Sequence, residues 1–404
     1  MNLFEKFGLS QALNTAIKKL GFKKPTLIQE KAIPAIHQKK NVIGESPTGS
    51  GKTLAFGCGI IDTVVPGKGV QALVLAPTRE LAEQVRGVLN QLAKEKKLKI
   101  LSIYGGVAIN PQIHNLPTAD VVVATPGRLL DHLQRRTVDL SKVKLLVLDE
   151  ADRMFDMGFI EDIEKILRLC PKKRQTLFFS ATISGDIKKF AKKYMVNPVR
   201  VSADKMVDPE KLKQVYYDVQ KNQKLALLIH LLKNEDSGLV MVFCNTRRNT
   251  DFVVKNLKAN KISAIAIHGG LTQNKRTKTI NLFNDAKVGA LVCTDVAARG
   301  LDIDNVSHVY NYDIPKDSKD YVHRIGRTAR AGEEGKVINI LCDYDHDNFS
   351  RILQAYREFK IEKIKIPALE KVTIKTSPQR RRAPAGRGRF ARNGRGHRKA
   401  HAYN

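Results

Sequence analysis

The chain has too few acidic residues to balance its basic ones. It contains 404 residues with 70 Lys and Arg against 40 Asp and Glu, which gives a formal charge of +30 and a pI near 9.9. Such an excess of basic residues indicates a polyanionic partner. Nucleic acid is favoured over an anionic membrane surface, because membrane binding would require an amphipathic basic helix. The length exceeds what one hydrophobic core holds, so two domains and additional segments are predicted.

Long apolar runs and paired cysteines are also missing. No apolar stretch approaches a membrane span, and residues 1–9 lack the apolar core of a signal peptide because Glu5 and Lys6 interrupt them. The five cysteines are an odd number, lie far apart and have no zinc-site spacing. They therefore predict reduced core thiols and a cytoplasmic protein.

A phosphate-binding loop is predicted near the N-terminus. The strand candidate Asn41–Gly44 runs into Ser46-Pro47-Thr48-Gly49-Ser50-Gly51-Lys52-Thr53, and an apolar helical stretch starts at Leu54. Glycines let backbone N–H groups face phosphate oxygens, Lys52 reaches the β- and γ-phosphates, and the Thr53 hydroxyl suits Mg²⁺. The whole set Ser46, Thr48, Gly49, Ser50, Gly51, Lys52 and Thr53 is therefore predicted to hold a nucleotide, against the alternative of a glycine turn before a helix.

Adjacent carboxylates follow a second apolar run. Asp149-Glu150-Ala151-Asp152 comes directly after Leu145–Leu148, and open α/β sheets bind ligands at the carboxyl ends of such strands. Alone, this pattern would indicate a structural turn. Together with the phosphate loop it predicts nucleoside triphosphate hydrolysis, with Asp149 holding Mg²⁺, partly through water, and Glu150 aimed at a water molecule.

The strand pattern occurs twice along the chain. Short apolar, β-branched segments alternate with helical periodicity in both halves, which predicts an α/β fold of two doubly wound parallel sheets. The expected strands after Asn41–Gly44 are 71–76, 99–104, 120–124, 144–148 and 176–179, then 238–244, 263–267, 290–293, 308–312 and 336–341. The sequence Tyr104-Gly105-Gly106 is echoed by His268-Gly269-Gly270, but the second half lacks a phosphate loop. One nucleotide site is therefore predicted to serve both domains.

The C-terminal segment has no acidic residues. From about Thr376 it carries nine basic residues with interspersed Gly, which leaves a charge near +21 for the rest of the chain. Such a composition predicts disorder and loose binding of single-stranded nucleic acid, with a solubility tail as the alternative.

The chain resembles the DEAD-box family of ATP-dependent RNA helicases from about Phe4 to Leu369. The resemblance rests on motifs in family order as well as on the two nucleotide motifs. These are Gly21-Phe22 with Pro25-Thr26 and Gln29, then Pro77–Ala82, Thr125–Arg128, Ser180–Thr182, Gln273 with Arg276, Thr294–Asp302 and His323–Arg330. Ser46 and Ala329 depart from the usual residues, and neither change removes a reactive group. The resemblance implies two tandem RecA-like domains at 1–203 and 213–369, a linker at 204–212 and an Arg/Gly-rich tail at 370–404.

The resemblance also implies roles for individual residues. Lys52, Asp149, Glu150 and the arginine fingers Arg327 and Arg330 are expected to be catalytic. Asp302 is expected at the nucleotide, and Asp152, Ser180, Thr182 and His323 are expected to couple the nucleotide to RNA. The RNA-binding residues are expected to be Pro77, Thr78, Arg79, Gly105, Gly106, Thr125, Pro126, Gly127, Arg128, Arg276 and Thr294.

The residues alone leave alternatives for three of these assignments: Arg327 with Arg330, Ser180 with Thr182, and Gln29. Arg327 and Arg330 would share a face if helical, yet they could be surface ion-pair partners of Asp320 or Glu333. Ser180 and Thr182 could cap a helix.

Gln29 could complete a capping box with Thr26, whereas the resemblance implies that it reads adenine while an aromatic packs on the base. Phe4 and Phe22 are both candidates for that aromatic, and the sequence does not choose between them.

The predicted function is an ATP-dependent RNA helicase that unwinds short duplexes locally and remodels RNA or ribonucleoprotein complexes. ATP and Mg²⁺ are the predicted cofactors. RNA is the predicted partner, bound mainly through sugar and phosphate, with ribonucleoprotein or RNA-decay proteins as candidate partners and a monomeric core. Two alternatives stay open: an ATP-gated RNA clamp or annealing chaperone, and DNA translocation.

Overall fold

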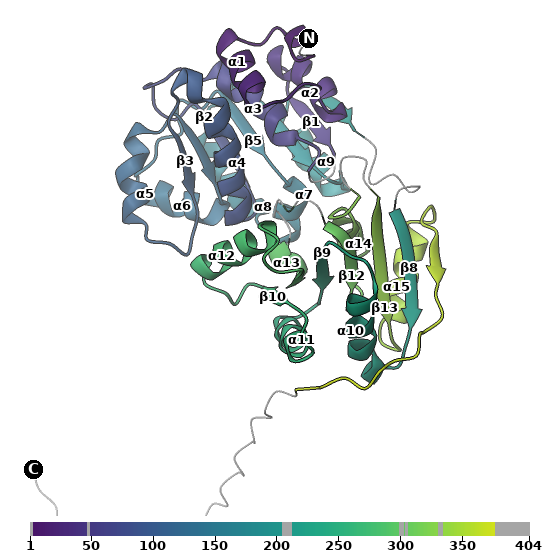
Figure 1. Ribbon diagram of the computed structural model, residues 1–404. Helices are drawn as coiled ribbons and strands as arrows, with labels where there is room; N and C mark the ends of the chain where they lie inside the picture. The colour runs from purple at the N-terminus through teal and green to yellow at the C-terminus, as the bar shows by residue number, and fades with distance from the viewer. Residues whose placement is uncertain are drawn as a thin grey trace, which may run out of the picture.

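The molecule contains two β-sheets of parallel strands, with α-helices packed on them (Figure 1). The structure is a computed structural model of the chain, and it describes residues 3–46, 49–203, 212–298, 303, 306–329 and 334–375. Each sheet has seven strands, and every pairing of neighbouring strands is parallel. The predicted α/β class with two doubly wound parallel sheets is confirmed.

The first sheet has the order β3-β4-β2-β5-β6-β1-β7. Its strands are β1 (Val42–Glu45), β2 (Ala72–Leu75), β3 (Ile100–Ile103), β4 (Val121–Ala124), β5 (Leu145–Leu148), β6 (Gln175–Ser180) and β7 (Val199–Ser202). Its helices are α1 (Gln11–Lys19), α2 (Leu27–His37), α3 (Lys52–Thr63), α4 (Arg79–Leu92), α5 (Asn110–Asn115), α6 (Pro126–Gln134), α7 (Ala151–Asp156), α8 (Ile160–Leu169) and α9 (Gly185–Tyr194), with short 3-10 turns η1 (Glu5–Phe7), η2 (Lys94–Lys96) and η3 (Leu116–Thr118).

Alternate residues of each strand pack on opposite faces of this sheet. In β5, Leu145 and Val147 join a core formed with α1 to α4, whereas Leu146 and Leu148 join a second core formed with α6 to α9. Successive side chains of a strand point to opposite faces, and both faces are covered, so the whole strand is apolar. This burial on both sides explains why the strand could be predicted from a continuous apolar run.

The second sheet repeats the first. Its order is β10-β11-β9-β12-β13-β8-β14, the order of the first sheet with each strand replaced by the one seven places later. The strands are β8 (Leu212–Asp218), β9 (Leu239–Phe243), β10 (Ala264–Ile267), β11 (Ala290–Cys293), β12 (Val306–Asn311), β13 (Gly335–Leu341) and β14 (Ile361–Lys363). The helices are α10 (Lys224–Asn234), α11 (Arg247–Ala259), α12 (Gln273–Asn284), α13 (Asp295–Ala298), α14 (Ser318–Ile325) and α15 (His346–Ala355), with the 3-10 turn η4 (Lys221–Gln223). The predicted internal repeat is thereby confirmed as repeated topology.

Three strands were not predicted: β7, β8 and β14. β7 and β14 are edge strands with exposed residues such as Arg200, and β8 carries Lys213 and Gln214 in place of an apolar run. Leu212, the last residue of the predicted linker, already belongs to β8, and residues 204–211 lie outside the described part.

The described chain continues past Leu369, where the tail was predicted to begin. The backbone of Thr373 is hydrogen-bonded to Asn260, the C-cap of α11, and that of Lys375 to Asn256 on α11. The basic residues from Arg380 onward lie outside the described residues.

The cysteines are all free and buried, as predicted from their spacing. Among the helices that the structure describes, none combines the length and apolar character needed to cross a bilayer.

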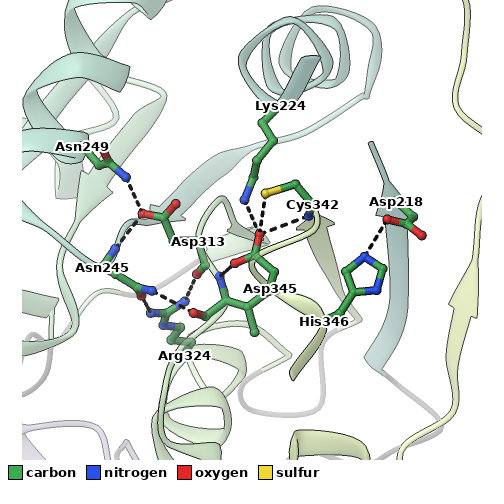
Figure 2. Close-up of polar contacts among 10 residues, drawn as sticks. Asp218, Lys224, Asn245, Asn249, Asp313, Arg324, Cys342, Asp345 and His346 are labelled. Carbon is green, nitrogen blue, oxygen red and sulfur yellow. Dashed lines mark hydrogen bonds and ion pairs between the residues drawn. The ribbon is translucent and has the colours of Figure 1, made fainter. Parts of the chain in front are cut away.

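Buried charged groups hold the carboxyl ends of the second sheet together (Figure 2). Arg324 donates to both Asp295 carboxylate oxygens at 2.6 and 2.8 Å, and to Asn245, Asn311 and the Asp313 carbonyl. These five contacts use all five N–H donors of a guanidinium, so its buried charge is fully compensated.

A second buried ion pair joins Lys224, at the start of α10, to Asp345, with Nζ 2.7 Å from Oδ2 (Figure 2). The same carboxylate accepts hydrogen bonds from the backbone N–H groups of Ile314 and Cys342. Asp345 therefore ties the loop after β12 to the loop after β13.

Replacing Asp345 with Ala should lower the free energy of unfolding of the second domain by about 3–5 kcal/mol, because it leaves the Lys224 ammonium buried without a counter-charge. Urea denaturation of the full chain measures this. Asp285→Ala is the matched control, since its pair with Lys287 is solvent-exposed and should contribute no more than about 1 kcal/mol. Equal losses in the two variants would contradict the prediction.

Candidate nucleotide pocket and RNA groove

The first candidate site is a pocket at the carboxyl ends of β1 and β5. It has a volume of about 250 Å³ and is lined by Phe22, Gln29, Gly49, Gly51, Lys52, Thr53, Leu54, Leu81, Gln84, Val88, Asp149 and Glu150. Most of the predicted nucleotide-binding residues therefore meet in one place. Thr48 and Asp302 lie outside the described residues.

The phosphate loop turns into α3 at Gly51. Its φ is +88°, and a Cβ there would overlap the Gln29 amide nitrogen, so both the backbone and the space favour glycine. Lys52 is buried and its Nζ donates to the Ser46 carbonyl at 3.0 Å. The Ser46 hydroxyl is hydrogen-bonded to the Ser50 hydroxyl, which gives the serine at this position a role in closing the loop.

The two predicted catalytic carboxylates lie side by side in this pocket. Asp149 is 2% exposed, and burial raises the pKa of its carboxyl to about 7 although the Lys52 ammonium lowers it. Glu150 has a left-handed backbone with φ at +51°, a conformation that is costly for a residue other than glycine. Its backbone N–H donates to Asp149 Oδ1 at 3.1 Å, so the turn orients the Asp149 carboxylate.

Oxygen donors suited to Mg²⁺ are present here. Mg²⁺ is commonly held by one or two carboxylates together with substrate phosphates and water, and Asp149 and Thr53 offer such oxygens beside the loop. Within the described residues, no group of three or more His, Cys, Asp and Glu side chains could hold a metal ion by itself. The donor set therefore fits a magnesium ion that arrives with a nucleotide.

Gln29 takes part in the capping box that was the alternative to its adenine role. Its Oε1 accepts from the Thr26 N–H at 2.9 Å, and its Nε2 donates to the Gly51 carbonyl at 3.0 Å. A carboxamide has two N–H groups and an oxygen with two lone pairs, so one donor and one acceptor site remain. The cap and adenine recognition are therefore compatible.

The two candidate aromatics occupy different environments. Phe22 is 41% exposed and lines the pocket. Phe4 is 1% exposed and packs in the first core against Phe7, with ring centroids 6.0 Å apart. The geometry favours Phe22 as the residue beside a bound base.

The predicted coupling residues of the first domain form one hydrogen-bonded group. Asp152 Oδ2 accepts from the Thr182 N–H at 3.0 Å and from its hydroxyl at 3.1 Å, while the Ser180 hydroxyl is 3.2 Å from the Asp152 N–H. The alternative that Ser180 or Thr182 caps the next helix is wrong, because Ser184 is the N-cap of α9. His323 lies half-buried on α14.

The premise that Arg327 is helical is wrong. α14 ends at Ile325, and Arg327 lies in the turn that follows. Its exposed fraction is 2%, so it does not lie on the surface, as the alternative of a surface ion pair assumed. Arg330 lies outside the described residues.

The second candidate site is a groove of about 410 Å³ between the two domains. Most of the predicted RNA-binding residues line it: Pro77, Thr78, Arg79, Gly105, Thr125, Gly127, Arg128 and Arg276. Among the other three, Gly106 lies against the Arg79 guanidinium, Pro126 begins α6 and Thr294 follows β11. The groove wall also contains Glu80, Met157, Phe159, Gly269, Leu271, Gln273 and Val296, which were not assigned to RNA.

Several of these unassigned residues carried a usable signal. Gly269 repeats the glycine pair of the first domain, and Gln273 belongs to the motif that contains Arg276. Met157, Phe159 and Leu271 carried none, because a single apolar residue has no distinctive pattern, whereas Val296 belongs to the Thr294–Asp302 motif.

Contacts across the groove join the two domains. Glu80 accepts from Arg276 at 3.2 Å and lies 3.4 Å from the Gln273 amide, and Arg153 donates to the Val296 carbonyl at 2.6 Å. Arg276, predicted to bind RNA, is therefore paired with a carboxylate in this structure. A phosphate would have to compete with Glu80 for it.

Comparisons with known proteins agree with this arrangement. The DEAD/DEAH box helicase family matches residues 26–190, and the helicase conserved C-terminal domain matches residues 223–332. The DEAD-box ATP-dependent RNA helicase CshA of Bacillus licheniformis is 44% identical over 371 residues, which cover 91% of this chain and 76% of that protein. CshA of Geobacillus kaustophilus is 44% identical over 374 residues, which cover 92% and 80%.

Solved structures of similar proteins share the fold. Saccharomyces cerevisiae Dbp5 bound to RNA and ADP BeF3 has a TM-score of 0.83 at 33% identity, covering 90% of this chain and 96% of that one. A Dbp5 variant bound to Gle1 and IP6 has a TM-score of 0.75 at 32% identity, covering 90% and 95%. A DEAD box protein from Methanococcus jannaschii has a TM-score of 0.56 at 43% identity, covering 90% and 99%. With its two family domains, its tandem RecA-like sheets and its relatives along nine-tenths of its length, the chain belongs to the DEAD-box family of ATP-dependent RNA helicases.

Proposed function

We propose that this helicase binds ATP in the pocket and RNA in the groove, and that closure of the two domains couples the two sites. The observation that carries this proposal is that one helix, α4, lines both. Thr78 and Arg79 at its start face the groove, whereas Leu81, Gln84 and Val88 face the pocket. A shift of α4 would change both sites together.

In the pocket, this chain's residues bind and orient the reactants. Phe22 packs on the adenine and Gln29 reads its edge with its remaining donor and acceptor. Lys52 compensates phosphate charge, Glu150 orients the attacking water, and Thr53 and Asp149 hold Mg²⁺, which when bound neutralises charge developing on the phosphates. Arg327 and Arg330 approach the γ-phosphate from the second domain, so hydrolysis depends on closure.

In the groove, RNA is held mainly through sugar and phosphate. Gly105, Gly127 and Thr125 offer close backbone approach and a hydroxyl, while Arg79 and Arg128 offer guanidinium groups, a set with little base information. Both ligands bind both domains, so each favours the closed state of the other. If the bound strand is bent in the closed groove, a duplex cannot follow the bend without losing base pairs. Stacking is about 1.4 kcal/mol per base-pair step in DNA, so closure melts a few pairs and unwinding stays local.

The comparisons support this reading. The Dbp5 structure with RNA and ADP BeF3 gives the higher TM-score of the two Dbp5 forms at nearly equal identity, so the domain arrangement here is closer to the RNA-bound one. The five free, buried cysteines support action in a reducing compartment, the cytoplasm. The domain limits 1–203 and 213–369, the tail and the monomeric core remain part of the proposal.

Replacing Phe22 with Ala should raise the ATP concentration needed for half-maximal hydrolysis and leave stability nearly unchanged, because the ring is exposed beside the pocket. Phe4→Ala is the matched control: it should lower the free energy of unfolding by about 3–5 kcal/mol. Steady-state kinetics and thermal unfolding separate the two. The reverse result would assign the base contact to Phe4.

Lys52→Ala and Glu150→Gln should fail in different ways, since one removes phosphate charge compensation and the other the group that orients water. Lys52→Ala should weaken ATP binding. Glu150→Gln should bind ATP and hold RNA in a long-lived closed complex, measured by RNA dissociation. Normal RNA-stimulated turnover in Glu150→Gln would reject its catalytic role.

Arg327→Ala should lose most RNA-stimulated hydrolysis, on the order of 10³-fold or more for an arginine finger. RNA affinity without nucleotide should stay close to that of the wild type. Arg381→Ala in the tail is the control and should leave hydrolysis intact. Near-normal turnover of Arg327→Ala would exclude the cross-cleft role.

Deleting residues 376–404 should raise the RNA concentration for half-activation while the maximum ATPase rate stays the same, because a tethered basic tail raises the local RNA concentration. If the tail neutralises about five phosphates, it contributes about −3.5 to the slope of the logarithm of RNA affinity against the logarithm of salt concentration, and deletion should remove this contribution. Unchanged half-activation and slope would point to a solubility role.

Strand-separation and annealing assays test the alternatives of an ATP-gated clamp and an annealing chaperone. Comparing RNA with DNA as activators of the ATPase tests the alternative of DNA translocation.

A further inference from the structure

Gln112 lies behind the wall of the RNA groove, and no role is assigned to it. It is on α5, is 7% exposed and does not line the groove itself. Its side chain contacts residues from two different strand ends. Nε2 donates to the Tyr104 carbonyl at 3.0 Å, and Oε1 accepts from Arg128 Nη1 at 3.2 Å. Tyr104 directly precedes Gly105 and Gly106, and Arg128 follows β4.

The orientation of the Gln112 amide is determined by its partners. A guanidinium only donates and a carbonyl only accepts, so Oε1 must face Arg128 and Nε2 must face Tyr104. Either contact alone would require this orientation, and the two agree. Gln112 therefore joins the Arg128 guanidinium to the glycine turn after β3.

His132 fixes the amide from the other side. The ring is fully buried, and burial lowers the pKa of the imidazole, so it is neutral at physiological pH. His132 Nε2 is 3.0 Å from Gln112 Oε1, which can only accept, so Nε2 carries the proton. Nδ1 then has no proton and faces the Thr137 hydroxyl at 2.8 Å, and the single proton of that hydroxyl is shared between Nδ1 and the His132 carbonyl oxygen, which lies 3.1 Å away.

We propose that Gln112 and His132 are positioning residues of the RNA groove: Gln112 holds Arg128 and the Gly105-Gly106 turn as one preformed unit, and His132 holds Gln112. This inference rests on the proposed RNA-binding role of the groove. Arg128 Nη2 also donates to the Val107 carbonyl at 3.1 Å, so two groups that do not line the groove hold the guanidinium, and its Nε lies 3.8 Å from Asp131 Oδ2.

The consequence is preorganisation of the phosphate contact. A guanidinium has four N–H groups on its two terminal nitrogens, and these two contacts use one on each, which leaves one donor on each for a phosphate. Without Gln112, Arg128 keeps its contact with the Val107 carbonyl but loses the hydrogen bond at Nη1, so part of the ordering of its side chain would have to occur when RNA binds. Ordering one long side chain weakens binding by about three- to tenfold.

The test uses the full chain and an unstructured single-stranded RNA oligonucleotide. Gln112→Met keeps the volume and removes the amide. The RNA concentration for half-maximal ATPase should rise about three- to tenfold, while the rate at saturating RNA should stay within about twofold. Asn115→Ala is the matched control, since Asn115 is an exposed residue of the same helix whose side chain, within the described residues, bonds only the Pro111 carbonyl.

Two further variants separate positioning from general stability. His132→Phe should raise half-activation, and His132→Gln, which returns an N–H donor near the place of Nε2, should restore it. In Gln112→Met with Arg128→Ala, the combined effect should be smaller than the product of the single effects, because Gln112 acts partly through Arg128.

Each outcome decides the proposal. Any of three results would overturn it. The first is an effect of Gln112→Met on half-activation no larger than that of Asn115→Ala, and the second is a loss of maximal rate as large as the loss of RNA affinity. The third is an effect of the double variant equal to the product of the two single effects. If Arg128→Ala itself leaves half-activation unchanged, the assignment of the groove to RNA fails as well. If Arg128→Ala weakens RNA activation and Gln112→Met does not, only the positioning role fails.

Discussion

The parallel direction of the strands is the constraint on which both sites depend. All carboxyl ends of a parallel sheet meet at one edge, and the loops that leave them carry the polar residues of the site. In the first domain this edge brings the phosphate loop after β1, the carboxylates after β5 and the Ser180–Thr182 segment after β6 together, although 134 residue positions separate the first from the last at Ser46 and Ser180. The same edge supplies the groove from β2, β3 and β4. The pocket and the groove thus lie on neighbouring parts of a single edge.

The second sheet repeats this topology with different chemistry at its strand ends. The phosphate loop of the first domain follows β1, whereas the equivalent strand of the second domain, β8, is not followed by such a loop. The corresponding edge is held by Arg324 with Asp295 and by Lys224 with Asp345, and Figure 2 shows the second of these pairs. Each of these buried charges is paired with an opposite charge, so none is left uncompensated, and the pairs fix the positions of the loops that carry them. Arg324 connects α13, which follows Thr294, to α14, which precedes Arg327. These contacts fix α13 and α14, and with them the chain on either side at Thr294 and Arg327, relative to each other.

Several site residues are already bonded within the protein. Gln29 completes a helix cap and contacts Gly51, Lys52 contacts the Ser46 carbonyl, and Arg276 pairs with Glu80 across the groove. Buried polar groups need partners, so groups that await a ligand are satisfied internally until it arrives. In the proposed function, ligand binding would exchange these partners, and the exchange at Arg276 would couple RNA binding to the contact between the domains.

The sequence by itself determined the fold class, most of the strands and the ATP-site chemistry, because strands buried on both faces read as apolar runs and phosphate binding demands a particular local order of glycine, lysine and threonine. It could not identify β7, β8 and β14, whose edge position or mixed polarity erases that pattern. Nor could it choose between Phe4 and Phe22, or find that Arg327 lies in a turn. Those facts depend on which side chains are covered by distant segments. Gln112 is the clearest case: it bonds to Tyr104, Arg128 and His132, and only the packing of α5 against α6 and the end of β3 brings these residues to one amide. A contact between separate elements leaves no periodic signal in any of them, so it is decided by tertiary structure alone.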